Sequence, residues 1–209
     1  MTMRNFPSRP IGWLAITTGA VAIFAVVSIT FMFAVGGIFG LLNDLANGAE
    51  AILSALLAWR LLPWLRSRAP RSSHFSLMAA WLGALIAVIG SALIIFDVTG
   101  WYLSGLYTMF GYALIGVWMF AVSYAALRSG AWLRHLPQLG LLAAICMALG
   151  FLAIPGILGG VDDVDAAPVL VNVGLLGSLG WMFLYPAWCL WLGHLLLSNS
   201  ARMGVAAQA

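Results

Sequence analysis

The chain has 209 residues, of which 64% are hydrophobic and only 7% are charged, and its net charge is +3. Soluble domains carry about 25% charged residues, so the composition excludes a soluble globular protein and predicts an all-α, polytopic membrane protein. Every basic residue is an arginine placed between apolar runs, so the positive balance indicates membrane topology and not a nucleic-acid partner.

The first two apolar runs follow a short polar segment, residues 1–10, which we expect in the cytoplasm. The run over residues 11–35 is longer than the apolar part of a signal peptide, about 7–15 residues, and long enough to span a bilayer. A glycine-rich turn separates it from a second span over residues 41–62. We predict that this helix ends at Pro63, because proline has no N–H to continue the hydrogen-bond ladder.

Four more apolar runs complete a predicted bundle of six transmembrane helices over residues 11–197. They cover residues 75–96, 101–127, 138–158 and 168–197, and a cytoplasmic tail, residues 198–209, follows. Small residues at helical spacing predict close helix contacts. They are Gly83, Ala87 and Ser91 on the third run, Gly140, Ala144 and Ala148 on the fifth, and Gly174, Gly177 and Gly180 on the sixth. Pro186 should kink the sixth helix.

The arginines predict the orientation of the bundle. If the six spans alternate in direction, all nine arginines fall on one side of the membrane and the five aspartates on the other. The excess of arginine in cytoplasmic loops then places both termini in the cytoplasm, and we expect the protein in the cytoplasmic (inner) membrane.

A short motif recurs in the two internal arginine-rich loops. Residues 64–66 and residues 132–134 both read Trp-Leu-Arg. The recurrence is compatible with a repeat of three hairpins, but tryptophan and arginine are also common at any cytoplasmic membrane boundary. The sequence leaves both interpretations open.

The second run carries the densest polar content of any apolar segment. Asn43, Asn47, Glu50 and Ser54 recur at intervals of 4, 3 and 4, so on a helix they share one face, with Asp44 beside it near the outer boundary. At ~1.5 Å per residue Glu50 lies roughly 14 Å inside a ~30 Å hydrocarbon core. A charged residue there costs about 2.5–3.5 kcal/mol, so the other helices should pack around this face.

Two interpretations of that face remain open. One is an outward-facing polar pocket with Glu50 at its floor, and the other is a hydrogen-bonded packing contact between helices. Further residues expected to line the pocket are Asp97 at an outer helix end, Thr108 and Tyr112 on the fourth run beside Ser104, and Asn172 on the sixth.

The sequence predicts no metal site, cofactor or catalytic residue. His74, His135 and His194 fall near the cytoplasmic side without the spacing of a zinc motif, and Cys146 and Cys189 lie in apolar runs as small hydrophobic residues. An acidic loop around Asp162 supplies oxygen ligands for a hard cation, although such loops are usually only solvated.

Three apolar motifs, FGLLNDLANG at residues 39–48, YTMFGYALIGVWMF at 107–120 and AIPGILGG at 153–160, give the chain a family resemblance. It resembles bacterial six-helix integral membrane proteins of an uncharacterised (domain of unknown function) family. The resemblance implies six helices in a bacterial inner membrane and carries over no functional residue.

The function expected from the sequence is the binding or passage of a small solute or ion through the outward pocket. The alternatives are an accessory or scaffold subunit that packs against a larger membrane partner or a second copy of the chain, and a membrane enzyme that modifies lipid. A pocket that reaches Glu50 favours the first, whereas a dry bundle with a large face of glycine and alanine favours the second.

Overall fold

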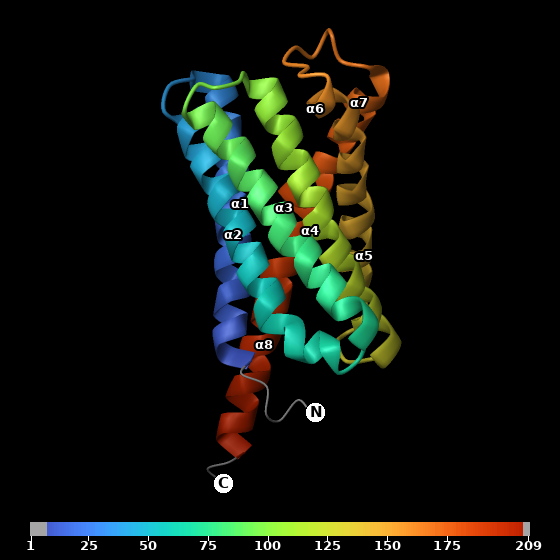
Figure 1. Cartoon of the computed structure of the whole chain (residues 1–209). Helices are drawn as coiled ribbons and strands as arrows, with labels where there is room; N and C mark the ends of the chain where they lie inside the picture. The colour runs from blue at the N-terminus through green and yellow to red at the C-terminus, as the bar shows by residue number, and fades with distance from the viewer. Residues whose placement is uncertain (1–7, 207–209) are drawn as a thin grey trace.

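Six helical spans form a bundle that matches the all-α, polytopic architecture predicted from the apolar runs (Figure 1). The computed structural model describes the backbone of residues 8–206 and the side chains of residues 8–198. Residues 1–7, with Arg4, and residues 207–209 lie outside the described part. Within residues 8–206 all regular secondary structure is helical.

The first four spans are continuous α-helices, and the last two are interrupted. The continuous helices are α1 (Ser8–Val35), α2 (Phe39–Arg66), α3 (Pro70–Ile95) and α4 (Trp101–Ser129). The fifth span consists of α5 (His135–Ala148), η2 (Leu149–Ala153) and α6 (Ile154–Leu158). The sixth consists of α7 (Val169–Gly174), η3 (Leu175–Gly177), η4 (Gly180–Leu184) and α8 (Tyr185–Ala206).

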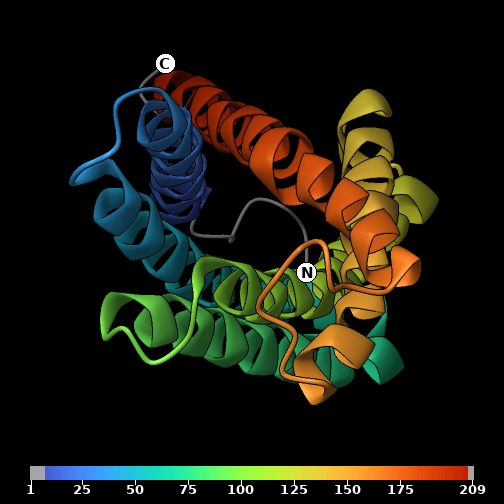
Figure 2. The same cartoon turned by 90° about the horizontal axis from the view of Figure 1, so that it is seen from above.

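The spans form a closed ring, which Figure 2 shows from one end. Each of the first five spans packs against the next along the chain, and the sixth closes the ring by packing against α1 and α5. Large apolar side chains point outward, among them Phe24, Leu82, Leu85 and Ile145. An apolar surface on all sides is what a lipid bilayer requires, so the chain is a multi-pass membrane protein.

Pro63 and Pro186 both lie within helices. The prediction that the second helix ends at Pro63 is wrong, because α2 continues to Arg66 and contains the proline. Near the end of a helix a missing N–H removes one hydrogen bond without ending the helix. In the sixth span a π-helical turn, η4, comes just before Pro186 and ends where the Tyr185 N–H bonds to the Gly180 carbonyl. The kink expected at Pro186 itself stays a prediction.

Glycine allows a close contact between α3 and α4. A Cβ atom added to Gly83 would lie 2.4 Å from the carbonyl oxygen of Gly111, and one added to Gly111 would lie 2.5 Å from the carbonyl oxygen of Gly83. The two backbones therefore touch, as the small residues of the third run predicted.

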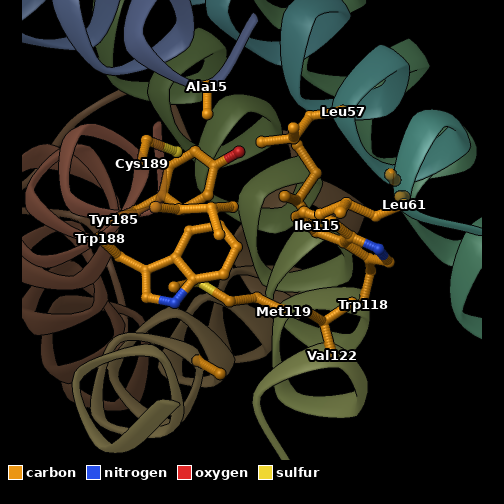
Figure 3. Close-up of a cluster of buried hydrophobic side chains, with 14 of the residues drawn as sticks. Ala15, Leu57, Leu61, Ile115, Trp118, Met119, Val122, Tyr185, Trp188 and Cys189 are labelled. Carbon is orange, nitrogen blue, oxygen red and sulfur yellow. The ribbon is translucent and has the colours of Figure 1, made fainter. Parts of the chain in front are cut away.

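Aromatic and aliphatic side chains fill the half of the bundle nearer the termini. Figure 3 shows these side chains packed against one another. We call this group the inner plug, and it consists of Ala15, Leu57, Leu61, Ile115, Trp118, Met119, Val122, Tyr185, Trp188 and Cys189, all nearly inaccessible. Between the plug and the end of the bundle that bears the termini, the two recurring tryptophans meet: the rings of Trp64 and Trp132 stack with their centroids 4.7 Å apart. The interior of the bundle is therefore packed with side chains at this level.

The two ends of the bundle carry opposite charge. The end that bears both termini also bears the connections α2–α3 and α4–α5, with arginines such as Arg68 and Arg134 (Figure 1). The opposite end bears the α1–α2 and α3–α4 turns and the loop of residues 159–168. The charged residues in those three connections are Asp97, Asp162, Asp163 and Asp165.

Candidate functional site

A cavity opens at the acidic end of the bundle, opposite the termini. Its volume is about 280 Å³, and α1, α2, α4 and the sixth span all contribute to its wall. The lining residues are Ile29, Phe33, Asn43, Asp44, Asn47, Trp101, Tyr102, Ser104, Gly105, Thr108, Met109, Leu175, Ser178, Trp181 and Met182. Ligand pockets commonly measure about 300–1,000 Å³, so this cavity suits a small molecule.

One turn and a half of α2 supplies the amide and carboxyl groups of the wall. Asn43 and Asn47 are about 95% buried and share a helical face, and Asp44 beside them is half-buried. The Asn43 amide donates a 3.2 Å hydrogen bond to the Asp44 carboxylate, which fixes both side chains. The Oδ1 atom of Asn47 is buried without a hydrogen-bond partner among the described residues. A buried acceptor of this kind is costly unless a ligand or water satisfies it.

The opposing wall on α4 presents hydroxyl groups. Ser104 donates to the Gly90 carbonyl of α3 at 2.8 Å, and Thr108 donates to the Ser104 carbonyl at 3.2 Å. Because both hydroxyl protons are used, the two oxygens remain available to the cavity only as acceptors.

The sequence suggested that Glu50 forms the floor of the cavity. In the structure Glu50 lies behind the cavity wall instead. Its side chain has no exposed surface, and neither carboxyl oxygen has a hydrogen-bond partner among the described residues. The hydroxyl of Tyr112 lies close enough to interact with the carboxyl, but donates its proton to the Asn47 carbonyl at 3.1 Å. Tyr112 therefore stands between the cavity residue Asn47 and the buried carboxyl.

The polar chain continues past Glu50 toward the inner plug. Ser54 donates to the Glu50 backbone carbonyl at 2.7 Å and accepts a 2.8 Å hydrogen bond from the hydroxyl of Tyr185. The side chains of Tyr185 and Cys189 also lie near Glu50. One polar column thus runs from the cavity through Asn47 and Glu50 to the top of the plug that Figure 3 shows.

Aromatic rings form much of the remaining wall, and the sequence analysis missed them. Trp181 stacks on Tyr112 with ring centroids 4.7 Å apart and planes 10° apart, so it covers the route from the cavity to Glu50. Trp101 lies at the mouth, half exposed, with its ring edge-to-face against Phe33. Trp181 sits in the interrupted sixth span, where a regular helical pattern gives a poor guide to facing.

Besides Glu50, Ser54 and Tyr112, two more of the predicted pocket residues lie outside the cavity wall. Asp97 is exposed in the α3–α4 turn at φ 54°. Asn172 is half-buried behind the wall, where its Oδ1 accepts a 2.9 Å hydrogen bond from the lining residue Tyr102. Asn172 therefore positions a wall residue and does not itself face the cavity.

The acidic loop has a structural contact at Asp162. Its carboxylate accepts hydrogen bonds from the backbone N–H groups of Gly100 and Leu103, at the start of α4. It is thus a cap supplied from a distant part of the chain. Over the described residues no group of three or more histidine, cysteine, aspartate or glutamate side chains is placed to hold a metal ion.

Comparison with protein-family models, with curated proteins and with solved structures found no match to this chain. The resemblance to bacterial six-helix membrane proteins therefore stays a prediction, and the cavity is interpreted from its own residues.

Proposed function

We propose that the protein binds a small solute or ion in the cavity at the acidic end, as the outward-facing stage of its passage across the cytoplasmic membrane. The observation that carries this proposal is the pairing of an open cavity with the unpartnered, buried acceptor of Asn47 in its wall. A wall with a few polar groups among apolar and aromatic side chains is typical of a ligand site.

The orientation is part of the proposal. With both termini in the cytoplasm, the arginines lie inside and the cavity opens outward. The inner plug then separates a bound solute from the cytoplasm, so passage requires the plug to open. The π-helical turn Gly180–Leu184 joins cavity residue Trp181 to plug residue Tyr185, and π-helical turns occur frequently at functional sites.

Glu50 is the second support for a functional interior. Ionisable residues inside a membrane are costly, face a bundle interior or cavity, and mark pathways for ions and protons. A packing contact between helices would satisfy both carboxyl oxygens, whereas the nearby hydroxyl of Tyr112 already donates to the Asn47 carbonyl and neither oxygen makes a hydrogen bond of normal geometry among the described residues. We therefore include Glu50, with Tyr112 and Ser54, in the pathway.

The scaffold alternative receives less support from the helix faces. The glycines that could admit a partner helix, such as Gly83 and Gly180, are used in contacts within the bundle, against α4 and α5. A lipid-modifying enzyme would require a reactive group at the cavity, and no catalytic motif supplies one.

Thiol labelling tests the proposal. In a chain with Cys146→Ala and Cys189→Ala, single cysteines at Asn47 or Thr108 should react with a membrane-impermeant methanethiosulfonate added outside cells. Ala49→Cys is the matched control, since it lies on the same helix at similar depth but faces outward into lipid, where thiolates do not form. Failure of both cavity cysteines to react, with the protein folded, contradicts an open outward cavity. A reporter fused to the C-terminus checks the cytoplasmic location independently.

A further inference from the structure

We infer that the solute is a small organic cation, an alkylammonium compound held by Asp44 and the aromatic wall; this rests on the proposed function and names its ligand class. Among the described residues, Asp44 is the only charged one that lines the cavity. None of the arginines and histidines within the described part of the chain belongs to the lining, and the three connections at this end carry only aspartates as charged residues. The half-buried carboxylate thus has no basic neighbour in the cavity to neutralise it.

The field at this end of the molecule favours the same ligand. Asp97, Asp162, Asp163 and Asp165 lie in the connections around the mouth, and the described arginines lie at the opposite end (Figure 1). A surface of one sign raises the local concentration of ligands of the other sign. Anions are therefore disfavoured at the mouth before any contact is made.

The aromatic rings distinguish an organic cation from a metal ion. Trp101, Tyr102 and Trp181 line a mostly apolar cavity that contains one carboxylate. A calcium site draws its affinity from several carboxylate ligands, whereas the described wall holds one carboxylate and otherwise only neutral oxygens. Tryptophan and tyrosine faces attract an ammonium group by about 0.5–2 kcal/mol and also bury its alkyl substituents. The unpartnered Oδ1 of Asn47 and the hydroxyl oxygens of Ser104 and Thr108 offer acceptors to an N–H or O–H of the ligand.

Equilibrium binding of radiolabelled choline to the full chain in lipid nanodiscs tests the inference. Saturable binding is expected, with competition by tetramethylammonium and methylammonium but not by 3,3-dimethyl-1-butanol, the uncharged isostere in which carbon replaces the choline nitrogen. Equal competition by the uncharged isostere overturns the inference, because charge then plays no part in recognition.

Four variants locate the contacts. Asp44→Asn keeps the shape of the side chain and should weaken choline binding about tenfold or more. Asp165→Asn removes the same charge from the exposed outer loop and should change affinity less than twofold. Trp101→Leu should weaken binding about two- to fivefold, and Trp101→Phe should retain most of it. Equal effects of Asp44→Asn and Asp165→Asn would show that only the general field acts, and would overturn the assigned site.

The two proposals fail separately. A chain that reacts with thiol reagents at position 47 but binds none of the three cations refutes the organic-cation ligand and leaves solute binding standing. A folded chain that neither reacts at positions 47 and 108 nor binds a cation refutes both.

Discussion

Two side chains one turn apart on α2 should respond to truncation with opposite signs. Glu50 and Ser54 are both fully buried. The Glu50 oxygens have no hydrogen-bond partner among the described residues, whereas Ser54 Oγ joins the hydroxyl of Tyr185 at 2.8 Å and the Glu50 carbonyl at 2.7 Å. Burial alone would rank the two positions alike, so the difference depends on their hydrogen bonds.

The expected magnitudes follow from the cost of an unpartnered buried polar group, about 1–3 kcal/mol. Glu50→Leu gives up only the contact with the Tyr112 hydroxyl, which keeps its hydrogen bond to the Asn47 carbonyl, and replaces two oxygens that lack normal hydrogen bonds with apolar atoms. It should therefore stabilise the fold by about 1–3 kcal/mol. Ser54→Ala leaves the hydroxyl of Tyr185 without an acceptor and should destabilise the fold by a similar amount. For a chain of this size each kcal/mol shifts the unfolding midpoint by about 2–4 °C.

Thermal unfolding of the purified variants in one detergent, followed by tryptophan fluorescence, measures both shifts. Glu50→Gln is the companion variant, which should fold normally and lose solute passage if the carboxyl serves the pathway. A lower midpoint for Glu50→Leu would mean that the carboxyl stabilises the bundle. Normal passage in both Glu50 variants would remove Glu50 from the pathway.

Five further variants, two of them controls, test the packing and the capping of α4. Gly111→Ala should destabilise the fold by about 1–3 kcal/mol, because the added Cβ meets the Gly83 carbonyl at 2.5 Å. Gly105→Ala, with open space around it, should be neutral or stabilising by up to about 1 kcal/mol. Equal unfolding midpoints for the two variants would contradict the close α3–α4 contact. Asp162→Ala should cost about 0.5–2 kcal/mol through loss of the α4 cap, and Asp165→Ala should lie within about 0.5 kcal/mol of the parent chain in the same unfolding measurement. Tyr102→Phe should cost about 1 kcal/mol by releasing Asn172, and an unchanged midpoint would show that this bond contributes nothing.

The sequence predicted the spans because hydrocarbon imposes one rule on the whole chain: about 20 consecutive apolar residues per helix. It also predicted that Asn43 and Asn47 share one face with Glu50, since helical periodicity alone fixes that. It did not predict that the cavity ends before it reaches Glu50. The stacked rings of Tyr112 and Trp181 separate the cavity from that carboxyl. Such a contact between α4 and the sixth span depends on tertiary packing and leaves no local pattern.

Irregular backbone explains the other differences. The sixth span contains 3₁₀ and π-helical turns, which change the direction in which later side chains point relative to earlier ones. Regular helical spacing therefore could not predict that Trp181 lines the cavity and that Asn172 lies behind its wall. Pro63 shows the converse, because a helix that is already packed continues past one missing hydrogen bond.

The position of the Glu50 side chain is the most direct test of a sheltered polar interior. An experimental density map of the chain in a lipid nanodisc, with side chains visible, should show this carboxyl inside the ring, behind Tyr112, with open volume reaching Asn47 from the acidic end. A Glu50 side chain turned toward the lipid, or a wall closed over Asn47 by direct packing, would contradict both the polar column and the binding cavity.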